Sequence, residues 1–342
     1  MLLPRFSAAV TALAALIALS ACSVGSAPDA QESERLSVYS GRSENLIRPL
    51  IDRFEAESGI DVDVRYGDTP EMAALLLEEG ENTRADVFLS QDAGALGALS
   101  SAGLFRSLPA EVTTAVPAGF TSTDGSWVGL TGRARVFVYD SERISAAEVP
   151  DSVDALTGPE WRGRVGIAPG NASFQAFVTA YRVLRGEDAA DRWLAGIAAN
   201  DPQIFDNNVA ILTAVNDGAL EIGLLNHYYW FRLAAEVGDD NMRAQLKFPA
   251  TGDPGAIVNV TGASVLAASS RNEQALQFIE YLLSPAAQEY FATEVHEYPL
   301  ARADAAPSGL PAIDSLANPE LDLSDLRSLS ETQELLAKHG LL

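Results

Sequence analysis

Residues 220–230 read LEIGLLNHYYW, and the rest of the chain is organised around this stretch. Its first part, Leu220 to Leu225, is largely apolar, which predicts a buried strand. Two adjacent tyrosines, Tyr228 and Tyr229, follow it closely. Tyrosine pairs are often packing residues with one polar end. Paired phenolates are also hard oxygen ligands, and a phenol with a pKa of about 10 gives up its proton at neutral pH only to a strong Lewis acid such as Fe³⁺.

Composition sets the broad class of the protein. The chain has 342 residues, of which 47% are hydrophobic and 20% charged, and its formal net charge is −24. This length suits two domains of ordinary size. The negative charge argues against nucleic acid as a partner, because binding to phosphates needs a basic face. It also disfavours broad contact with anionic lipid.

The N-terminus predicts export and lipid attachment. Residues 1–21 form a signal peptide whose apolar run is too short for a stable membrane span. The run Leu19-Ser20-Ala21-Cys22 has the form of a bacterial lipobox, and Cys22 is the single cysteine of the chain. We expect Cys22 to carry the lipid and residues 22–35 to form a tether. The alternative is an ordinary secretory signal with an incidental cysteine. With Cys22 lipidated, no free thiol remains for a disulfide or a thiolate metal site.

The first third of the mature chain alternates strands and helices. Residues 36–40, 60–66 and 85–89 are predicted strands, separated by helices that begin at Ser43 and at residue 70. This order indicates a parallel sheet with helices on both faces. Ligands of such sheets lie beyond the carboxyl ends of the strands. We therefore expect the turns at residues 39–43 and 90–91 to face one crevice.

A second α/β unit follows. Residues 133–139, 165–168 and 219–225 are predicted strands, and a helix begins at the turn of residues 169–173 and reaches about residue 185. The start of this helix offers free N–H groups to an anion, although a plain N-cap is the simpler interpretation. Asn208 is predicted to cap the helix of residues 209–216. The apolar segment 257–267 and residues 133–139 would form two antiparallel crossings, a hinge between lobes.

Six short motifs, in order and suitably spaced, carry a family resemblance. They are VYSGR at 38–42, ADVFLSQD at 85–92, GRARV at 132–136, NASFQ at 171–175, DNN at 206–208 and NHYY at 226–229. The chain resembles the ferric-ion-binding proteins of bacterial ABC importers, a branch of the solute-binding proteins. The resemblance implies an α/β fold of the periplasmic binding protein type II, with two lobes joined by a two-strand hinge. Lobe 1 would comprise residues 36–132 and 257–307, and lobe 2 residues 133–256 and 308–342.

The resemblance also implies a set of site residues. Tyr228 and Tyr229 match the tyrosine pair that binds iron in the family, and Tyr39 and Glu44 are candidate metal ligands from lobe 1. The alternatives are that Tyr39 is only a strand residue and that Glu44 only balances a helix dipole. The residues expected around a synergistic anion, carbonate or phosphate, are Arg42, Ser43, Gln91, Asn171, Ala172, Ser173, Asn208 and Asn226.

Some of these positions depart from the family pattern or call for comment. The guanidinium fork of Arg42 fits a bidentate grip on a small oxyanion. Many family members carry histidine where this chain has Ser43, and some carry a third tyrosine where it has Phe174. His227 is left out of the ligand set, because a ferric site prefers hard oxygen donors and because on a strand its side chain would point away from its neighbours.

Together these observations predict a monomeric, lipid-anchored, extracytoplasmic binding protein. It would capture ferric iron with an anion and deliver it to the permease and ATPase subunits of an importer. A protein of the same fold for an oxyanion or a small organic ligand, such as thiamine, a polyamine or a phosphonate, is the alternative. We expect no enzymatic activity, since the sequence contains no nucleophile elbow, H-E-x-x-H or P-loop motif. A purely structural surface lipoprotein is a further possibility.

Overall fold

The computed structural model describes residues 35–302, 307–316 and 321–342. The predicted signal peptide, the lipidation site Cys22 and nearly all of the tether lie outside these residues. In the part that is described, no helix combines the length and the apolar character needed to cross a membrane.

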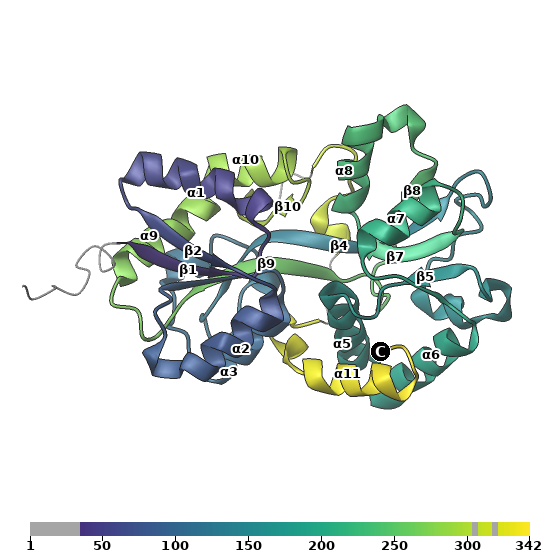
Figure 1. The fold of residues 1–342 in the computed structure, drawn as a ribbon, viewed down its shortest axis with the longest axis horizontal. Helices are drawn as coiled ribbons and strands as arrows, with labels where there is room; N and C mark the ends of the chain where they lie inside the picture. The colour runs from purple at the N-terminus through teal and green to yellow at the C-terminus, as the bar shows by residue number, and fades with distance from the viewer. Residues whose placement is uncertain (1–34, 303–306, 317–320) are drawn as a thin grey trace, which may run out of the picture. The chain divides into compact units, whose positions relative to one another are not determined.

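Lobe 1 begins with a parallel sheet. β1 (Leu36–Ser40) is hydrogen-bonded in parallel to β2 (Val62–Tyr66) on one side and to β3 (Val87–Ser90) on the other. Helices lie on both sides of it: α1, α9 and α10 on one, α2 and α3 on the other (Figure 1). Their bounds are α1 (Glu44–Ser58), α2 (Thr69–Glu79), α3 (Ala93–Ser101), α9 (Asn272–Leu283) and α10 (Pro285–Thr293). The predicted parallel α/β arrangement is confirmed.

Two long strands connect the lobes. β4 (Val128–Asp140) is buried over all 13 of its residues, and β9 (Val258–Val265) is buried over all 8. β9 is antiparallel to both β3 and β4. The sequence predicts two separate segments at 128–130 and 133–139, whereas the structure has one strand with an irregularity between Gly129 and Thr131. The two antiparallel crossings predicted for the hinge are therefore present.

Lobe 2 extends the same sheet. Across the described residues, ten strands form one sheet of order β2-β1-β3-β9-β4-β7-β5-β6, with β8 and β10 paired to β4. The strands of this half are β5 (Val165–Ile167), β6 (Gln203–Ile204), β7 (Ile222–Asn226) and β8 (Ala244–Lys247). The helices are α5 (Ala172–Arg185), α6 (Glu187–Ala199), α7 (Asn208–Asn216) and α8 (Tyr228–Val237). The remaining elements include α4 (Ala110–Thr113), β10 (Tyr298–Pro299) and α11 (Leu329–Lys338).

A glycine in β7 permits close packing of this sheet against α7. A β-carbon on Gly223 would lie 2.3 Å from a methyl group of Ile211, closer than real β-carbon contacts. Any side chain there would push α7 off the sheet and shift the strand that leads to the tyrosine pair.

Some local predictions were wrong. Asn207, not Asn208, occupies the N-cap position of α7 and accepts a hydrogen bond from the backbone N–H of Ala210. Ser43 precedes α1, but its side chain makes no capping hydrogen bond. Residues 323–337, whose pattern predicts one helix, form two elements, a 3₁₀ helix η8 (Leu323–Arg327) and α11.

The C-terminal residues, expected to belong with lobe 2, pack on both lobes. η8 lies on α3 of lobe 1, where a β-carbon on Gly94 would come within 2.8 Å of the Leu326 carbonyl oxygen. α11 lies on α5 of lobe 2, where the Arg182 guanidinium donates to the Thr332 hydroxyl at 2.8 Å. The C-terminus therefore forms a further connection between the two halves of the molecule.

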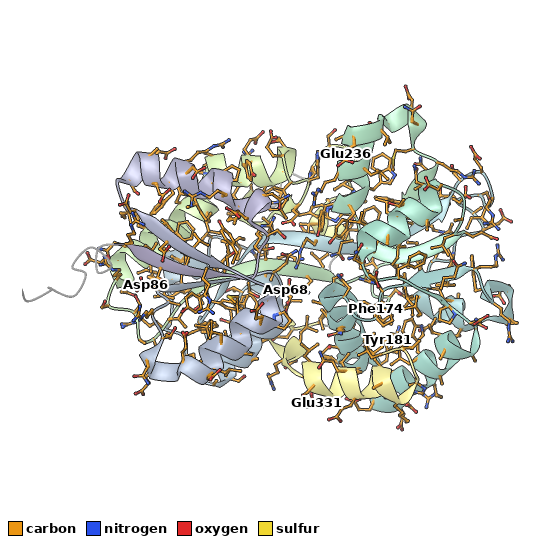
Figure 2. The ribbon with its side chains drawn as sticks, in the orientation of Figure 1. Asp68, Asp86, Phe174, Tyr181, Glu236 and Glu331 are labelled. Atoms are coloured by element: carbon orange, nitrogen blue, oxygen red, sulfur yellow. The ribbon has the colours of Figure 1, made fainter. Side chains whose placement is uncertain are left out.

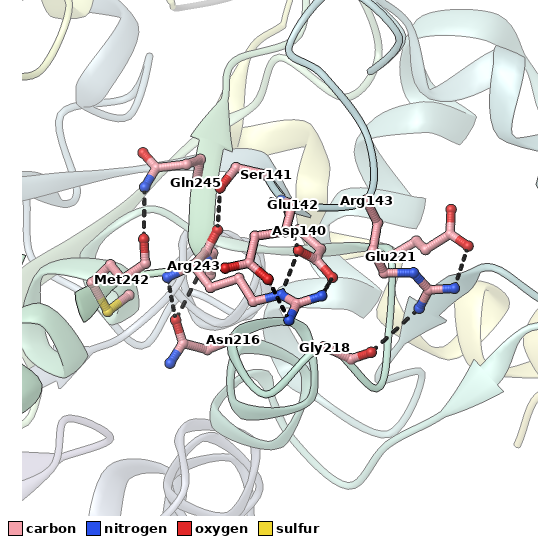
Figure 3. Close-up of polar contacts among 11 residues, drawn as sticks. Asp140, Ser141, Glu142, Arg143, Asn216, Gly218, Glu221, Met242, Arg243 and Gln245 are labelled. Carbon is pink, nitrogen blue, oxygen red and sulfur yellow. Dashed lines mark hydrogen bonds and ion pairs between the residues drawn. The ribbon is translucent and has the colours of Figure 1, made fainter. Parts of the chain in front are cut away.

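A cluster of ion pairs stabilises the C-terminal end of β4 (Figure 3). The fully buried Asp140 carboxylate accepts two hydrogen bonds of 2.6 Å from Arg243, which also pairs with Glu142 at 2.7 Å. Burial acts to raise the pKa of Asp140, but the hydrogen bonds from Arg243 outweigh it, and the net pKa lies below its usual range. The pair joins the end of β4 to the start of β8.

We expect Asp140→Asn to lower the free energy of unfolding by about 2–4 kcal/mol, because it breaks a largely buried pair. The wild-type contribution should be present above about pH 4, the carboxyl pKa of the unfolded chain, and be lost as the pH falls through the lower folded value. Denaturant unfolding at several pH values measures both effects. Glu142→Gln is the matched control, and it should cost less than about 1 kcal/mol because Glu142 is exposed. Equal losses in the two variants would contradict this assignment.

Candidate functional site

A pocket of about 670 Å³ lies between the lobes. It lies at the carboxyl ends of the parallel strands, where ligands of such sheets bind. Its lining residues are Gly41, Arg42, Ser43, Tyr66, Gly67, Asp68, Thr69, Pro70, Glu71, Gln91, Asp92, Arg133, Gly170, Asn171, Ala172, Ser173, Asp206, Asn226, Tyr228, Tyr229 and Asn259. The lining includes residues from both lobe 1 turns, at 39–43 and 90–91, that were expected to face one crevice.

The lobe 1 wall is drawn together by Thr69. A β-carbon on Gly41 would lie 2.1 Å from the Thr69 hydroxyl oxygen, so glycine is required for this approach. The hydroxyl donates to the Gly41 carbonyl at 3.2 Å and accepts from the backbone N–H of Gln91 at 3.1 Å. One threonine thus joins the ends of β1 and β3 to the start of α2. Asp68 lies beside it, at the end of α2 that faces lobe 2 (Figure 2).

The lobe 2 wall begins with the turn before α5. The Asn171 carboxamide oxygen accepts from the Ser173 backbone N–H at 3.0 Å and from the Ser173 hydroxyl at 2.6 Å. The Asn208 amide group donates to the Ser173 hydroxyl oxygen at 3.1 Å. This pattern is an N-cap that fixes the first turn, and Ala172 opens the helix with a free backbone N–H. The turn can accept an anion at the positive end of α5.

The tyrosine pair lies opposite, at the start of α8. Tyr228 is 1% exposed and Tyr229 is half-buried, and their rings stack with centroids 4.2 Å apart. Burial raises the pKa of Tyr228 well above its ordinary value; the neighbouring phenol adds to this, while Arg133 opposes it. Tyr228 is therefore protonated at neutral pH, and any ligand that needs its phenolate must displace a proton.

The floor of the pocket comes from the two hinge strands. Arg133 of β4 pairs directly with Asn259 of β9, and both residues line the pocket. Arg133 is 3% exposed, and its Nε has no hydrogen-bond partner; the same is true of the Asn259 Nδ2. Within the described residues Arg133 makes no ion pair. Two residues that line the pocket thus carry buried donors without partners, and Arg133 adds a positive charge, which suits a negatively charged ligand.

A second buried arginine lies behind the turn before α5. Arg135 is stacked on the rings of Phe174 and Phe177, at 5.2 and 5.1 Å, and donates to the Ser173 carbonyl oxygen at 3.3 Å. Burial lowers the pKa of Arg135 to about 9, an effect that the Tyr229 phenol opposes. Arg135 remains charged at neutral pH and adds positive potential beside Tyr229.

The prediction that Arg42 grips an anion with its guanidinium fork is wrong in this structure. Arg42 is fully buried, and both of its terminal nitrogens donate to Glu297, at 3.2 and 3.0 Å. One of them also donates to the Thr261 hydroxyl at 2.7 Å. A fork already held by a buried carboxylate is not available to a ligand. Arg42 lines the pocket, but its guanidinium is paired with Glu297 and has a structural role there.

Three further predicted residues do not reach the pocket. Tyr39 is buried, and its hydroxyl donates to Glu79 at 3.2 Å. Glu44 is an exposed residue in the first turn of α1, on a separate groove beside β2. Neither lines the pocket with Tyr228, so the two lobe 1 metal ligands expected from the sequence are not brought to the site. Asn208 is also absent from the lining and supports Ser173 instead.

The pocket also contains residues that the sequence alone does not single out: Arg133, Asn259, Asp92, Asp206 and the segment of residues 66–71. The rule that ligands meet the carboxyl ends of parallel strands could have found residues 66–71, which follow β2. No sequence pattern identifies the Arg133–Asn259 pair, because its partners are brought together only by the register of the hinge strands. In the described part of the chain, no three His, Cys, Asp or Glu side chains form a cluster suited to a metal ion.

Two α/β lobes with a polar pocket between them, joined by long buried strands, define a two-lobed binding protein of the periplasmic type. Residues 82–318 match the model of the family described as bacterial extracellular solute-binding protein, and the chain belongs to that family. The family resemblance seen in the motifs and the predicted fold class are both confirmed.

Named relatives and solved structures are similar to most of the chain. It is 33% identical over 329 residues to an Fe(3+)-binding periplasmic protein of Serratia marcescens, covering 96% of this chain and 97% of the relative. It is 33% identical to the major ferric iron-binding protein of Neisseria meningitidis, covering 90% and 93%. The structure of iron-bound HitA from Pseudomonas aeruginosa superposes with a TM-score of 0.84 at 33% identity, covering 90% of this chain and 99% of HitA.

The new assignment of Arg42 can be tested through its partner. We expect Glu297→Met to lower the free energy of unfolding by about 3–5 kcal/mol, because it leaves a buried guanidinium without its counter-charge. The double variant Arg42→Met with Glu297→Met should be more stable than Glu297→Met alone. Thermal and denaturant unfolding of the three proteins measure this. If the Arg42 guanidinium did not depend on Glu297 as its counter-charge, Glu297→Met would be nearly as stable as the wild type.

Proposed function

We propose that this protein captures ferric iron outside the cytoplasm and delivers it to the permease of an importer. The observation that carries the proposal is the stacked pair Tyr228 and Tyr229, which lines the pocket between the lobes. The relatives named above are ferric iron-binding proteins, and HitA holds iron in its solved structure.

The chemistry of the pair suits a trivalent ion. Phenolate is a hard oxygen ligand, and Fe³⁺ is acid enough to displace the phenol proton near neutral pH. Burial raises the pKa of Tyr228, and the buried charge of Arg133 opposes this and favours its phenolate. Because protons and metal compete for the same oxygens, low pH should weaken binding.

An anion from solvent completes the coordination shell in this proposal. The pocket offers a negative ligand the turn of residues 171–173 and the unpartnered donors of Arg133 and Asn259. Ser43, Gln91 and Asn226 also line it and are proposed to contact the anion. Carbonate and phosphate fit this donor set. A Trichodesmium relative, 27% identical with a TM-score of 0.79, was solved in complex with iron and citrate.

Delivery follows from the two-lobed design. Closure of the lobes about β4 and β9 would enclose the ion, and reopening at a membrane permease driven by an ATPase would release it. We propose that the lipid on Cys22 keeps the monomer at the outer side of the membrane. Catalysis has no part in this scheme, in keeping with relatives that are named as binding and uptake proteins.

Removing both phenol oxygens tests the proposal. We expect Tyr228→Phe with Tyr229→Phe to abolish the visible charge-transfer colour with ferric citrate and to weaken iron binding more than about a hundredfold, since two ligands are lost. Absorption titration and metal analysis after dialysis measure this. Tyr281→Phe, which changes a tyrosine of α9 outside the pocket, is the control and should bind iron like the wild type. Full colour in the double variant would refute iron ligation by this pair.

A pair of matched cap variants tests the anion site. Asn171→Ala and Asn207→Ala each remove a helix N-cap, at a cost of about 1 kcal/mol in unfolding. Only Asn171 lines the pocket, so only Asn171→Ala should weaken phosphate binding to the iron-loaded protein, by several-fold. Calorimetry with phosphate, with and without iron, measures this. Tight phosphate binding without iron would instead favour an oxyanion as the transported ligand.

A further inference from the structure

The helix that carries the tyrosine pair starts in an unusual way. No side chain caps the first turn of α8, and the residue at its N-cap position is His227. β7 pairs with β4 up to Asn226 opposite Arg135, and the backbone N–H of His227 still donates to the Ala134 carbonyl at 3.0 Å. The His227 carbonyl, however, turns into α8 and accepts from the backbone N–H of Trp230 at 3.1 Å.

The imidazole ring of His227 replaces its own carbonyl as the hydrogen-bond acceptor for β4. The backbone N–H of Ala134, which would otherwise bond to β7, donates to the His227 Nδ1 at 3.2 Å. The Nε2 lies 2.8 Å from the His296 carbonyl oxygen. Nδ1 also lies 3.3 Å from the Ala134 carbonyl oxygen, but the shorter contact with the His296 carbonyl places the proton on Nε2, which leaves Nδ1 as the acceptor. Both ring nitrogens of a fully buried side chain are therefore engaged with backbone groups.

His296, whose carbonyl oxygen accepts from the His227 ring, has an uncommon backbone conformation. His296 has a positive φ of 60°, which few non-glycine residues adopt. Its ring stacks on Phe231 with centroids 5.2 Å apart and planes 19° apart. Phe231 follows His227 by one helical turn, so both contacts come from the same face of α8. The segment of residues 296–298 thus holds α8 at two points.

The same segment reaches the opposite wall of the pocket. Between His296 and Tyr298, the Glu297 carboxylate accepts from Arg42 and, at 2.6 Å, from the Thr131 hydroxyl. Tyr298 pairs with Gly132 of β4, and its ring lies 5.1 Å from that of His227. A continuous chain of contacts therefore runs from Arg42 in lobe 1, through residues 296–298, to the start of α8.

We propose that His227 is a positioning residue that fixes Tyr228 and Tyr229 relative to the lobe 1 wall through its bonds to Ala134 and His296. An apolar side chain of similar size would fill the same space but leave a buried N–H and a buried carbonyl without partners, which is costly. The first turn of α8 would then move or fray, and with it the phenol oxygens. The part of this inference that concerns iron rests on the proposed function.

Three variants of the full-length mature protein test it. His227→Leu removes both bonds, and His227→Gln restores an amide N–H that can reach the His296 carbonyl. Asn200→Ala is the matched control: Asn200 is a buried residue of lobe 2 whose amide group donates to the carbonyls of Leu156 and Gly158, away from the pocket. The readouts are ferric citrate titration, the position of the charge-transfer band, and hydrogen exchange of residues 228–237 in iron-free protein.

We expect His227→Leu to bind iron about tenfold more weakly, with a shifted charge-transfer band, and to exchange the amides of α8 about tenfold faster. His227→Gln restores only the bond to His296 and should recover part of each effect, whereas Asn200→Ala should lower the melting temperature without changing either the band or exchange in α8. If His227→Leu loses stability as the control does but keeps the band, the affinity and slow exchange in α8, the positioning role is wrong.

The exchange measurement separates this inference from the proposed function. If wild-type protein gives no colour and binds no ferric iron, the proposed function fails, and exchange in α8 still decides whether His227 fixes the helix. If His227→Leu does not fold, the comparison of His227→Gln with wild type decides instead. If amide exchange in α8 and affinity for iron are the same in His227→Gln as in the wild type, loss of the Nδ1 acceptor has no effect. The proposed role of the Ala134 bond would then be overturned.

Discussion

β4 is the element on which the rest of the structure depends. It is buried over its whole length and hydrogen-bonds to β9 and β10 in its first half and to β7 and β8 in its second. Successive side chains of a strand point to opposite faces, so Arg133 and Arg135 share one face. That face meets the pocket and the start of α5. One continuous strand thus joins the lobes and places two buried cations next to the ligand-binding groups.

These cations define what the pocket can accept. The chain as a whole is strongly acidic, yet Arg133 and Arg135 are buried without an ion pair in the described residues. Opposite them stand the phenols of Tyr228 and Tyr229, and burial raises the pKa of Tyr228 well above its ordinary value. A ligand that satisfies both must bring positive charge to the tyrosines and negative charge to the arginines. A trivalent metal ion accompanied by an anion meets both requirements, which a bare cation or a bare oxyanion does not.

The two walls contribute different chemistry. Lobe 2 supplies the phenols and the helix start, while lobe 1 supplies turns tied together by Thr69 and an arginine already neutralised by Glu297. Phe174, in the position where some relatives carry a third tyrosine, is fully buried against Arg135 and not in the pocket. The proposed metal ligands of this chain are therefore concentrated on lobe 2, and in the proposed mechanism closure of lobe 1 would add mainly donors for the anion.

The sequence by itself determined the local elements and the residues at strand ends. Apolar periodicity located β1, α1, α5 and β7, and the rule for parallel sheets directed Gln91 to the pocket, because these features depend only on short-range pattern. Asn171 and Ser173 are expected there from the family resemblance and from the start of the helix that they open. Tertiary structure alone decided which polar groups remain free for a ligand. Arg42 is held by Glu297, 255 residues away in sequence, and Tyr39 by Glu79. Arg133 and Asn259 are brought together by the register of two strands, and the Arg133 Nε and the Asn259 Nδ2 are left without partners. Hydrogen bonding between residues distant in sequence satisfies some side chains and leaves others open, and no local pattern records which.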